Sequence, residues 1–329
     1  MKTFSDERIY KMATPVVFAN PRVFSYYKKA LKLDRFQYTT IKNFETTSHN
    51  SLNIFPAWEE EFDINIGKPT KETGAFALKS LAIACKALQD NQIDALVTAP
   101  INKHMVQQNE KDFSGQTEFL QQYFKSENNL MFMTSDLLKV GLVTNHKSIK
   151  DVAASITEDL ILKKIKLMHQ SLMYDFGISK PKIAVLALNP HAGDKGTIGS
   201  EEIDIIYPAV LQARAENMLV FGPYAADGFF GSGNYAGFDG ILAMYHDQGL
   251  IPFKLMAQEN GINFTAGMDI IRTSPDHGTA EDIAGKGVAD ETSFRNAIYA
   301  AIDIYNNRAE YEQNHSNPLT EFTEHQEDR

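Results

Sequence analysis

Residues 157–193 read TEDLILKKIKLMHQSLMYDFGISKPKIAVLALNPHAG, and this stretch decides the fold class. Apolar residues recur every three or four positions over Thr157–Phe176, which predicts an amphipathic helix. The short apolar run Lys182–Leu188 then predicts a buried strand. A polar cluster, Asn189–Gly193, follows directly. A helix, a strand and a polar turn in this order are typical of an α/β protein.

The same alternation recurs along the chain, so we expect an α/β fold. The predicted strands are Pro15–Ala19, Ala95–Thr98, Lys139–Thr144, Lys182–Leu188 and Gly240–Tyr245. The predicted helices are Arg22–Lys32, Gly74–Gln89, Gln116–Phe124, Thr157–Phe176, Glu201–Glu216 and Phe294–Asn306. The polar segment from about Tyr311 to Arg329 is expected to be a frayed tail.

Composition excludes several classes of protein. The chain has 329 residues, enough for two domains, and 43% of them are hydrophobic. No apolar stretch has the length of a membrane span, and Met1–Met12 does not resemble a signal peptide, so we expect a cytoplasmic protein that does not bind membranes. The net charge of −10, without a basic patch, disfavours nucleic acid as a partner. The single cysteine, Cys85, lies in an apolar helical run and is expected to be buried.

Three predicted strands are each followed by a histidine: His146, His191 and His246. The carboxyl ends of strands face the ligand crevice in open α/β sheets. Each histidine alone could simply cap its strand or bind a backbone carbonyl, but three in equivalent positions favour a metal site. Three imidazoles with one open position are typical of a catalytic divalent-metal centre. Nitrogen ligands favour zinc, with Mg, Mn and Co as alternatives.

Downstream residues suggest sites for anions and for a nucleotide. Lys254, Asn263 and Arg272 could hold a phosphate or carboxylate, although the two cations could equally be ordinary surface residues. The run His277–Gly287 combines glycines and small residues with acidic side chains, which allows backbone to approach a ligand and a carboxylate to bind a ribose hydroxyl. Lys254 and Asp247 are the candidate general bases, because both are close to His246 in sequence.

The start of the chain is unusual for this fold class. An amphipathic helix is predicted over Ser5–Met12, within a few residues of Met1. A doubly wound domain normally begins with a strand, which such a helix follows. We therefore expect either that the sheet lacks one strand or that the sequence is shorter at the front than its ancestor.

Three motifs together resemble one family. They are Asn-Pro-His-Ala-Gly at 189–193, Ala-Met-Tyr-His-Asp-Gln-Gly at 243–249 and Arg-Thr-Ser-Pro-Asp-His-Gly-Thr-Ala at 272–280. In these motifs the chain is similar to the 4-hydroxythreonine-4-phosphate dehydrogenases of vitamin B6 biosynthesis, from about Ser5 to Asn306. The resemblance implies oxidation of 4-phosphooxy-L-threonine to 2-amino-3-oxo-4-phosphooxybutanoate, which decarboxylates to 3-amino-2-oxopropyl phosphate.

The resemblance also implies an architecture. It predicts two α/β/α domains, as in isocitrate and isopropylmalate dehydrogenases, and a homodimer with its active site at the interface. Residues 1–113 and 258–312 would form a nucleotide-side domain. Residues 114–257 would form a central domain with the metal ligands and dimer contacts, and residues 313–329 a polar tail.

Most of the family's functional residues correspond to positions that the sequence pattern singled out above. The implied metal ligands are His146, His191 and His246. The implied substrate contacts are Thr117, Lys254, Asn263 and Arg272, with Gln116 beside them. The loop that resembles the adenosine-binding loop of isopropylmalate dehydrogenase contributes His277, Gly278, Thr279, Ala280 and Asp282. Asp282 at the ribose-reading position favours NAD over NADP.

Two departures from the family pattern bear on function. Gln116 stands where the family has histidine, and glutamine can donate a hydrogen bond but cannot carry a proton. The family's opening strand and Gly-Asp-x-x-Gly-Ile-Gly loop have no counterpart here. Two alternatives therefore stay open beside the main prediction: a paralogue acting on 4-phospho-threonate or 4-phospho-erythronate, and a metal-binding relative without activity. A metal-dependent hydrolase is a third.

Overall fold

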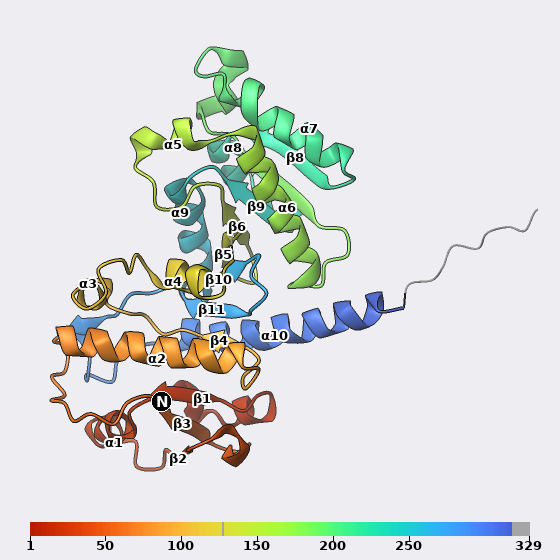
Figure 1. Cartoon of the computed structure of the whole chain (residues 1–329). Helices are drawn as coiled ribbons and strands as arrows, with labels where there is room; N and C mark the ends of the chain where they lie inside the picture. The colour runs from red at the N-terminus through yellow and green to blue at the C-terminus, as the bar shows by residue number, and fades with distance from the viewer. Residues whose placement is uncertain (127, 318–329) are drawn as a thin grey trace, which may run out of the picture.

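The computed structural model describes residues 1–126 and 128–317, and its strands form two sheets (Figure 1). The smaller sheet has the order β1-β3-β2, and the larger has the order β4-β11-β10-β5-β6-β9-β7-β8. The strands are β1 Val16–Ala19, β2 Tyr38–Thr40, β3 Leu52–Pro56, β4 Leu96–Val97, β5 Leu130–Thr134, β6 Lys139–Leu142, β7 Lys182–Leu186, β8 Leu219–Tyr224, β9 Gly240–Ala243, β10 Ile262–Ala266 and β11 Arg272–Pro275.

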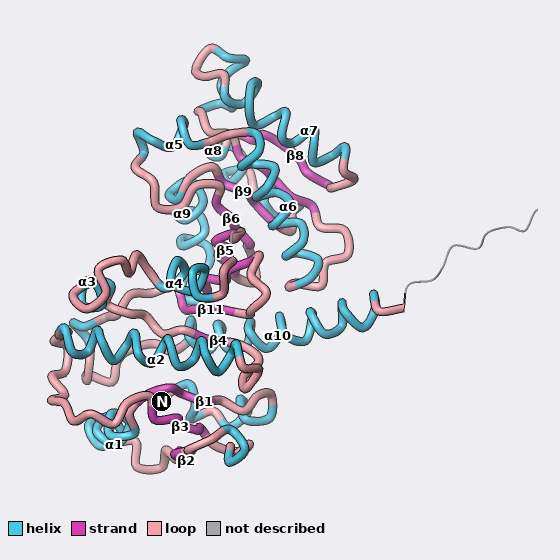
Figure 2. Tube along the Cα trace, in the orientation of Figure 1, coloured by secondary structure: helices cyan, strands magenta, loops and turns pink. Residues whose placement is uncertain are grey.

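Helices connect most of these strands and cover the larger sheet (Figure 2). The α-helices are α1 Pro21–Ala30, α2 Lys71–Gln89, α3 Lys103–Gln107, α4 Gln116–Tyr123, α5 Ile149–Ser155, α6 Glu158–Tyr174, α7 Tyr207–Ala215, α8 Ala226–Gly231, α9 His246–Ala257 and α10 Thr292–His315. In the part of the chain with assigned structure, no helix combines the length and apolarity that crossing a membrane requires.

Strand direction determines which residues share an edge of the larger sheet. Strands β6, β9, β7 and β8 are mutually parallel. Strand β5 is antiparallel to both β6 and β10, so β10 runs in the same direction as β6. Strand β11 is antiparallel to β10 and parallel to β4. The start of β11, at Arg272, therefore lies on the same edge as the carboxyl ends of β6, β9 and β7.

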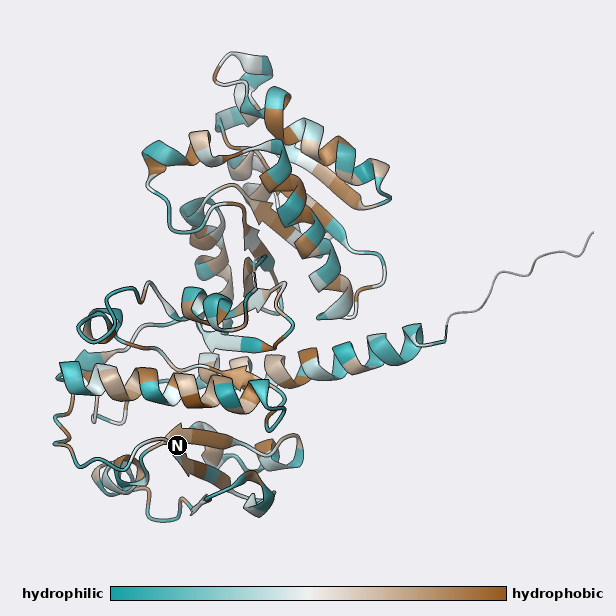
Figure 3. Ribbon diagram, in the orientation of Figure 1, coloured by the Kyte–Doolittle hydropathy of each residue, from teal (hydrophilic) through white to brown (hydrophobic). Residues whose placement is uncertain are grey.

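The central part of the larger sheet has apolar layers on both faces, as the brown strands in Figure 3 indicate. Ile183 and Val185 of β7 belong to the core formed with α6 and α7. The alternate residues Ala184 and Leu186 belong to the core formed with α8 and α9. Successive side chains of a strand point to opposite faces, so a strand covered on both faces is apolar throughout. This arrangement explains the uninterrupted apolar runs of the sequence and confirms the α/β class.

The structure also corrects parts of the prediction. The expected helix at Ser5–Met12 is wrong, because that segment forms two short 3-10 turns, Thr3–Ser5 and Glu7–Lys11. The predicted tail is wrong for Tyr311–His315, which continue α10, and residues 318–329 lie outside the described chain. The predicted helix Glu201–Glu216 is divided into a π-helical turn, Glu202–Ile206, and α7.

Candidate active site at the edge of the larger sheet

The three histidines follow three neighbouring parallel strands. His146 comes after β6, His246 after β9 and His191 after β7, and these strands are adjacent in the order β6-β9-β7. Their carboxyl ends therefore meet at one edge of the sheet, as the sequence predicts. The polar segment 97–103, Val-Thr-Ala-Pro-Ile-Asn-Lys, begins at the end of β4, which runs in the opposite direction.

Two of the three imidazoles are close together. The ring centroids of His146 and His246 are 5.9 Å apart, with planes inclined by 41°. Nδ1 of His246 lies 2.7 Å from Oδ1 of Asp247, and a carboxylate only accepts, so this nitrogen donates. The other ring nitrogen, Nε2, is then left with its lone pair for a ligand. No group of three His, Cys, Asp or Glu side chains at metal-binding spacing occurs within the described residues.

His191 lies in a left-handed turn, the most unusual backbone segment of the site. His191, Ala192, Gly193, Asp194 and Lys195 have successive φ values of 53°, 52°, 77°, 42° and 56°. Left-handed conformation costs roughly 1 kcal/mol for each residue with a Cβ atom. Such strain persists only where surrounding contacts enforce it, and it is common at functional sites.

Buried Glu202 provides those contacts. Its Oε1 accepts hydrogen bonds from the backbone amides of Leu188 (2.8 Å) and Asn189 (2.7 Å). A Cβ at Gly193 would lie 2.6 Å from both Glu202 Oε2 and the carbonyl oxygen of Gly199. Only glycine therefore fits at position 193, and the His191 turn is held against the end of β7.

Two polar side chains tie the three strand ends to one another. Gln248 accepts from the amide of Met244 at 2.7 Å and donates to the carbonyl of Ala187 at 2.6 Å, which joins β9 to β7. Thr144 Oγ1 donates to the carbonyl of Met244 at 2.7 Å, which joins β6 to β9. These bonds fix the relative positions of the segments that carry the histidines.

Arg272 is a buried cation that forms no ion pair among the described residues, and the charge of Glu118 offsets only part of the effect of burial on its pKa. Its exposed fraction is 4%, and burial lowers the pKa of its guanidinium to about 10, so it stays charged at neutral pH. The guanidinium donates to Thr98 Oγ1 (3.0 Å), Thr265 Oγ1 (3.4 Å) and Gln116 Oε1 (3.2 Å), all neutral acceptors. A guanidinium carries five N–H donors, and three of its hydrogen bonds are accounted for here. Its positive charge and its remaining donors are therefore available to bind an anion.

The other predicted substrate-binding residues differ in whether they contact Arg272. Asn263 lies opposite Ser274 in the β10–β11 pair, and its buried Oδ1 accepts no hydrogen bond from the described protein. Gln116 contacts Arg272 directly, and Thr117 follows it in the first turn of α4. Lys254 is more exposed and forms an ion pair with Asp276 at 3.1 Å. The structure thus groups Gln116 with Arg272, whereas Lys254 is tied to the loop after β11.

The predicted nucleotide loop is exposed and open. A Cβ at Gly278 would meet nothing within 4 Å, and His277, Thr279 and Asp282 are exposed. Ala280 is left-handed (φ 50°) and precedes a 3-10 turn, Glu281–Ile283. Asn102 donates to Glu281 Oε1 at 2.8 Å, which connects the loop to the segment after β4. The loop has space for a ligand and an exposed carboxylate at Asp282.

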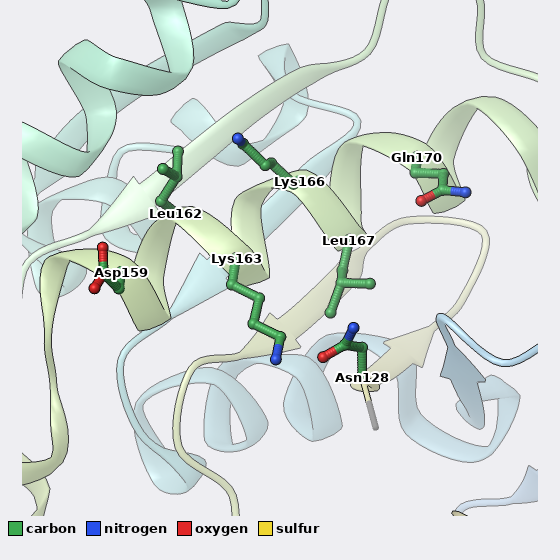
Figure 4. A pocket seen from close by; sticks show the side chains of 7 residues that line it. All are labelled: Asn128, Asp159, Leu162, Lys163, Lys166, Leu167 and Gln170. Carbon is green, nitrogen blue, oxygen red and sulfur yellow. The ribbon is translucent and has the colours of Figure 1, made fainter. Parts of the chain in front are cut away.

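A separate hollow on α6 is unrelated to these residues. Figure 4 shows it along the outer side of α6, where Lys163 points toward Asn128. It is lined by Asn128, Asp159, Leu162, Lys163, Lys166, Leu167 and Gln170. None of the predicted site residues contributes to it.

Sequence reasoning missed several residues that position this site. Thr265 is a hydroxyl inside a buried apolar strand, a signal that the sequence does offer. Gln248 appears in the sequence only as part of the 243–249 motif and Glu202 only as part of the predicted helix Glu201–Glu216, and their backbone contacts depend on the fold. Cys85 is buried as expected, and burial raises the pKa of its thiol to about 12.

Comparison with known proteins places the chain in a family. Residues 11–301 match the family described as "Pyridoxal phosphate biosynthetic protein PdxA". A Bacteroides thetaiotaomicron protein named 4-hydroxythreonine-4-phosphate dehydrogenase is 46% identical over 320 residues, which cover 97% of this chain and 88% of that protein. A relative of the same name from Sulfurihydrogenibium is 42% identical over 74% of each chain.

Solved structures agree with this assignment. The 4-hydroxythreonine-4-phosphate dehydrogenase of Burkholderia phymatum superposes with a TM-score of 0.77 at 31% identity, over 92% of both chains. That of Klebsiella pneumoniae gives 0.75 at 30% identity, over 91% of this chain and 95% of that chain. A terephthalate 1,2-cis-dihydrodiol dehydrogenase shares the fold alone, with a TM-score of 0.62 at 22% identity. The chain therefore belongs to the PdxA family, and its fold is the expected one, that of the isocitrate and isopropylmalate dehydrogenases.

Proposed function

We propose that this chain oxidises the C3 hydroxyl of 4-phosphooxy-L-threonine with NAD. The alcohol loses a hydride to the nicotinamide and a proton to a base, which gives 2-amino-3-oxo-4-phosphooxybutanoate and NADH. Loss of carbon dioxide from this β-keto acid then gives 3-amino-2-oxopropyl phosphate. The chain is an oxidoreductase of a family whose curated members carry the dehydrogenase name.

The single observation that carries the proposal is the environment of Arg272. A buried, charged guanidinium is costly unless an anion compensates it; its hydrogen-bond partners are all neutral, and Glu118 offsets only part of the effect of burial on its pKa. Planar guanidinium donors suit the oxygens of phosphate or carboxylate. We assign Arg272 to an anionic group of the substrate, with Gln116 and Thr98 orienting the guanidinium. The unpartnered Oδ1 of Asn263 would accept a donor of the substrate.

The histidines fit a divalent cation. The close approach of His146 and His246, and the Asp247 carboxylate that orients His246, form the donor arrangement that zinc sites use. We propose that His191, from the neighbouring strand β7, is the third ligand. When bound, the metal lowers the pKa of the substrate alcohol and stabilises its alkoxide. Zinc is favoured over Mg, Mn or Co because all three donors are nitrogen.

The 277–287 loop is proposed to hold the adenosine part of the cofactor. Its open position at Gly278 allows close approach of a ligand, and exposed Asp282 can accept hydrogen bonds from both ribose hydroxyls. A carboxylate at this position repels a 2′-phosphate, so NAD is favoured over NADP.

The two candidate bases differ in their contacts. Asp247 already accepts from His246, which suits it to orienting that ligand. Lys254 Nζ is 3.1 Å from Asp276 Oδ1, in a pair whose lysine side chain is exposed and whose aspartate side chain is half-buried. An ion pair with a carboxylate favours the protonated amine, which holds an anion rather than accepting a proton, so Lys254 and Asp247 both stay candidates for the proton acceptor.

We also propose a homodimer with the active site at its interface. Helix α9 begins at His246 and carries two strongly exposed apolar side chains, Ile251 (59%) and Leu255 (74%). Ile203 and Leu211, in the segment after the His191 turn, are exposed as well. Exposed apolar groups beside the site residues favour burial by a second copy.

A NAD-reduction assay with purified 4-phosphooxy-L-threonine tests the function. We expect metal-dependent formation of NADH that a chelator abolishes and added zinc restores. Faster turnover of 4-phospho-threonate or 4-phospho-erythronate would instead establish the paralogue. Metal binding without reduction of NAD by any of the three compounds would contradict dehydrogenase activity and favour an inactive relative or a hydrolase.

A further inference from the structure

The segment that follows strand β4 begins against the anion site. Thr98 Oγ1 accepts a hydrogen bond from Nε of Arg272 at 3.0 Å. Gln116 donates to the carbonyl of Ala99 at 2.9 Å and accepts from Nη2 of Arg272 at 3.2 Å. Two consecutive residues of the segment therefore hold the guanidinium, one directly and the other through Gln116.

A few residues further along, the same segment contacts the 277–287 loop. Asn102 uses both ends of its amide, because Oδ1 accepts from the backbone amide of Met105 at 3.1 Å and Nδ2 donates to Glu281 Oε1 at 2.8 Å. Within the described chain, no other hydrogen bond joins residues 277–287 to the rest of the protein. Hydrogen bonds from Thr279 and Asn102 hold the pKa of the Glu281 carboxyl below its ordinary 4.5, so this acceptor is charged at neutral pH.

The residues between these two contacts form a stiff connection. Pro100 has a fixed φ angle, and Ile101 packs against the apolar cluster under helix α2. The loop, in contrast, is open at Gly278, where a Cβ would meet nothing within 4 Å. A change in the position of Thr98 is therefore passed on to Asn102 and from there to a loop that has room to move.

We propose that residues 98–102 couple the binding of an anion at Arg272 to the binding of a nucleotide at the 277–287 loop. The link is the hydrogen bond between Asn102 and Glu281, which makes Asn102 a positioning residue. This coupling rests on the function proposed above, which places the anion and the nucleotide at these two sites. A bound anion fixes the guanidinium and the segment attached to it, so less ordering of the loop remains when the nucleotide binds. The effect is reciprocal, because coupling between two binding sites always is.

An exchange of donor and acceptor separates this link from a general effect on folding. Asn102→Asp keeps the oxygen that accepts from Met105 but places a carboxylate against Glu281, so the link breaks while the helix cap stays. Glu281→Gln is the matched control, because it keeps an acceptor for Asn102. In the double variant, the new amide at position 281 donates to the new carboxylate at position 102, and the bond forms again in the reverse direction.

Amide hydrogen exchange by NMR, without any cofactor, is the first measurement. Saturating inorganic phosphate should slow exchange at Ile283 and Ala284, whose amides bond within the loop, at least about threefold relative to chloride at equal ionic strength. Amides inside helix α6 should not respond. The slowing should be absent in Asn102→Asp, present in Glu281→Gln and restored in the double variant.

Calorimetry gives the coupling itself. In the parent protein, the Kd for inorganic phosphate should be about fivefold lower with saturating NAD than without it, near the low end of usual couplings. The ratio should fall to about one in Asn102→Asp and recover in the double variant.

Three results would overturn the coupling: loop exchange that ignores phosphate in the parent protein, equal phosphate affinity with and without NAD, or loss in Asn102→Asp without rescue in the double variant. The function proposed above fails separately. Loop protection by phosphate without NAD binding would contradict the cofactor assignment and support the link. Reduction of NAD with no effect of phosphate on the loop would support the dehydrogenase and contradict the link.

Discussion

The Asp247 carboxylate lies 2.7 Å from Nδ1 of His246 and fixes the tautomer that leaves Nε2 available for a ligand. Replacing Asp247 by Ala removes this orientation without removing a donor to the metal. We expect the dissociation constant for zinc to rise by about 10- to 100-fold, the usual effect of losing a carboxylate behind a histidine ligand. Competition with a chromogenic chelator measures it. Asp247→Asn, which keeps an acceptor, should recover part of the affinity, and unchanged affinity in Asp247→Ala would contradict this role.

Substitution of Arg272 distinguishes a role in binding the anionic substrate from a role in stabilising the fold. Arg272→Met removes a buried charge that forms no ion pair and whose hydrogen-bond partners are all neutral, so we expect unfolding stability to change by less than about 1 kcal/mol or to increase. The KM for the phosphorylated substrate should rise by about 10- to 100-fold, because a charged hydrogen-bonding pair is lost. A large loss of stability with an unchanged KM would show that Arg272 is structural.

The buried ion pair Arg308–Asp175 links α10 to α6. In contrast to Arg272, we expect Arg308 to contribute to the stability of the fold. Nε of Arg308 donates to Asp175 Oδ1 at 2.7 Å, and Ser171 donates to Oδ2 at 2.6 Å. Arg308→Met leaves the carboxylate buried and uncompensated, so we expect a destabilisation of about 3 kcal/mol or more by urea unfolding. The double variant with Asp175→Asn should lose less than Arg308→Met alone, because no charge is left unpaired.

The pH dependence of the Arg308→Met variant has a defined sign. Burial already raises the pKa of Asp175 above its ordinary 3.8, and loss of the guanidinium removes the charge that opposes this shift. A raised pKa in the folded state means that the folded protein binds the proton more tightly than the unfolded chain does. The contribution of Asp175 is therefore most favourable at low pH and is lost as pH rises through the folded pKa. The deficit relative to the parent protein should shrink as pH falls from 7 to 5; a constant deficit would contradict the assignment.

Gly193 should be the least replaceable glycine of the site. Its φ of 77° is left-handed, and an added Cβ would lie 2.6 Å from Glu202 Oε2. We expect Gly193→Ala to displace the His191 turn, lower zinc occupancy and cost about 1–3 kcal/mol of stability. Gly228→Ala is the matched control, since a Cβ there meets nothing within 4 Å. Equal effects of the two substitutions would argue against a special role for Gly193.

Long periodic segments and fully apolar runs were predictable from sequence. Helices α2 and α6, and strands β7 and β9, begin and end within a few residues of their predicted limits, because burial on one or both faces imposes a strong pattern. Strands β10 and β11 were missed because their buried faces include Asn263, Thr265 and Arg272, polar residues that belong to the site. These polar site residues interrupt the apolar pattern that would have identified β10 and β11 as buried strands in the sequence.

The candidate site was partly predictable for the same reason. Three histidines at strand ends were visible in the sequence, but their position on adjacent strands β6, β9 and β7 depends on sheet order. The left-handed turn at His191 and the Glu202 carboxylate that holds it were not visible, since backbone strain has no sequence period. The segment Thr3–Lys11 forms 3-10 turns in place of the predicted helix, and its residues Phe4 and Ile9 belong to the same apolar cluster as Ile298 of α10.

The central claim is that imidazoles that follow three adjacent strands bind one divalent ion. Measuring the metal content of the protein tests this claim most directly. We expect the protein, loaded with zinc and freed of excess by gel filtration, to retain one equivalent per chain. His191→Ala should retain its fold and lose the metal together with NAD reduction. One retained zinc with full turnover in the His191→Ala variant would contradict the account.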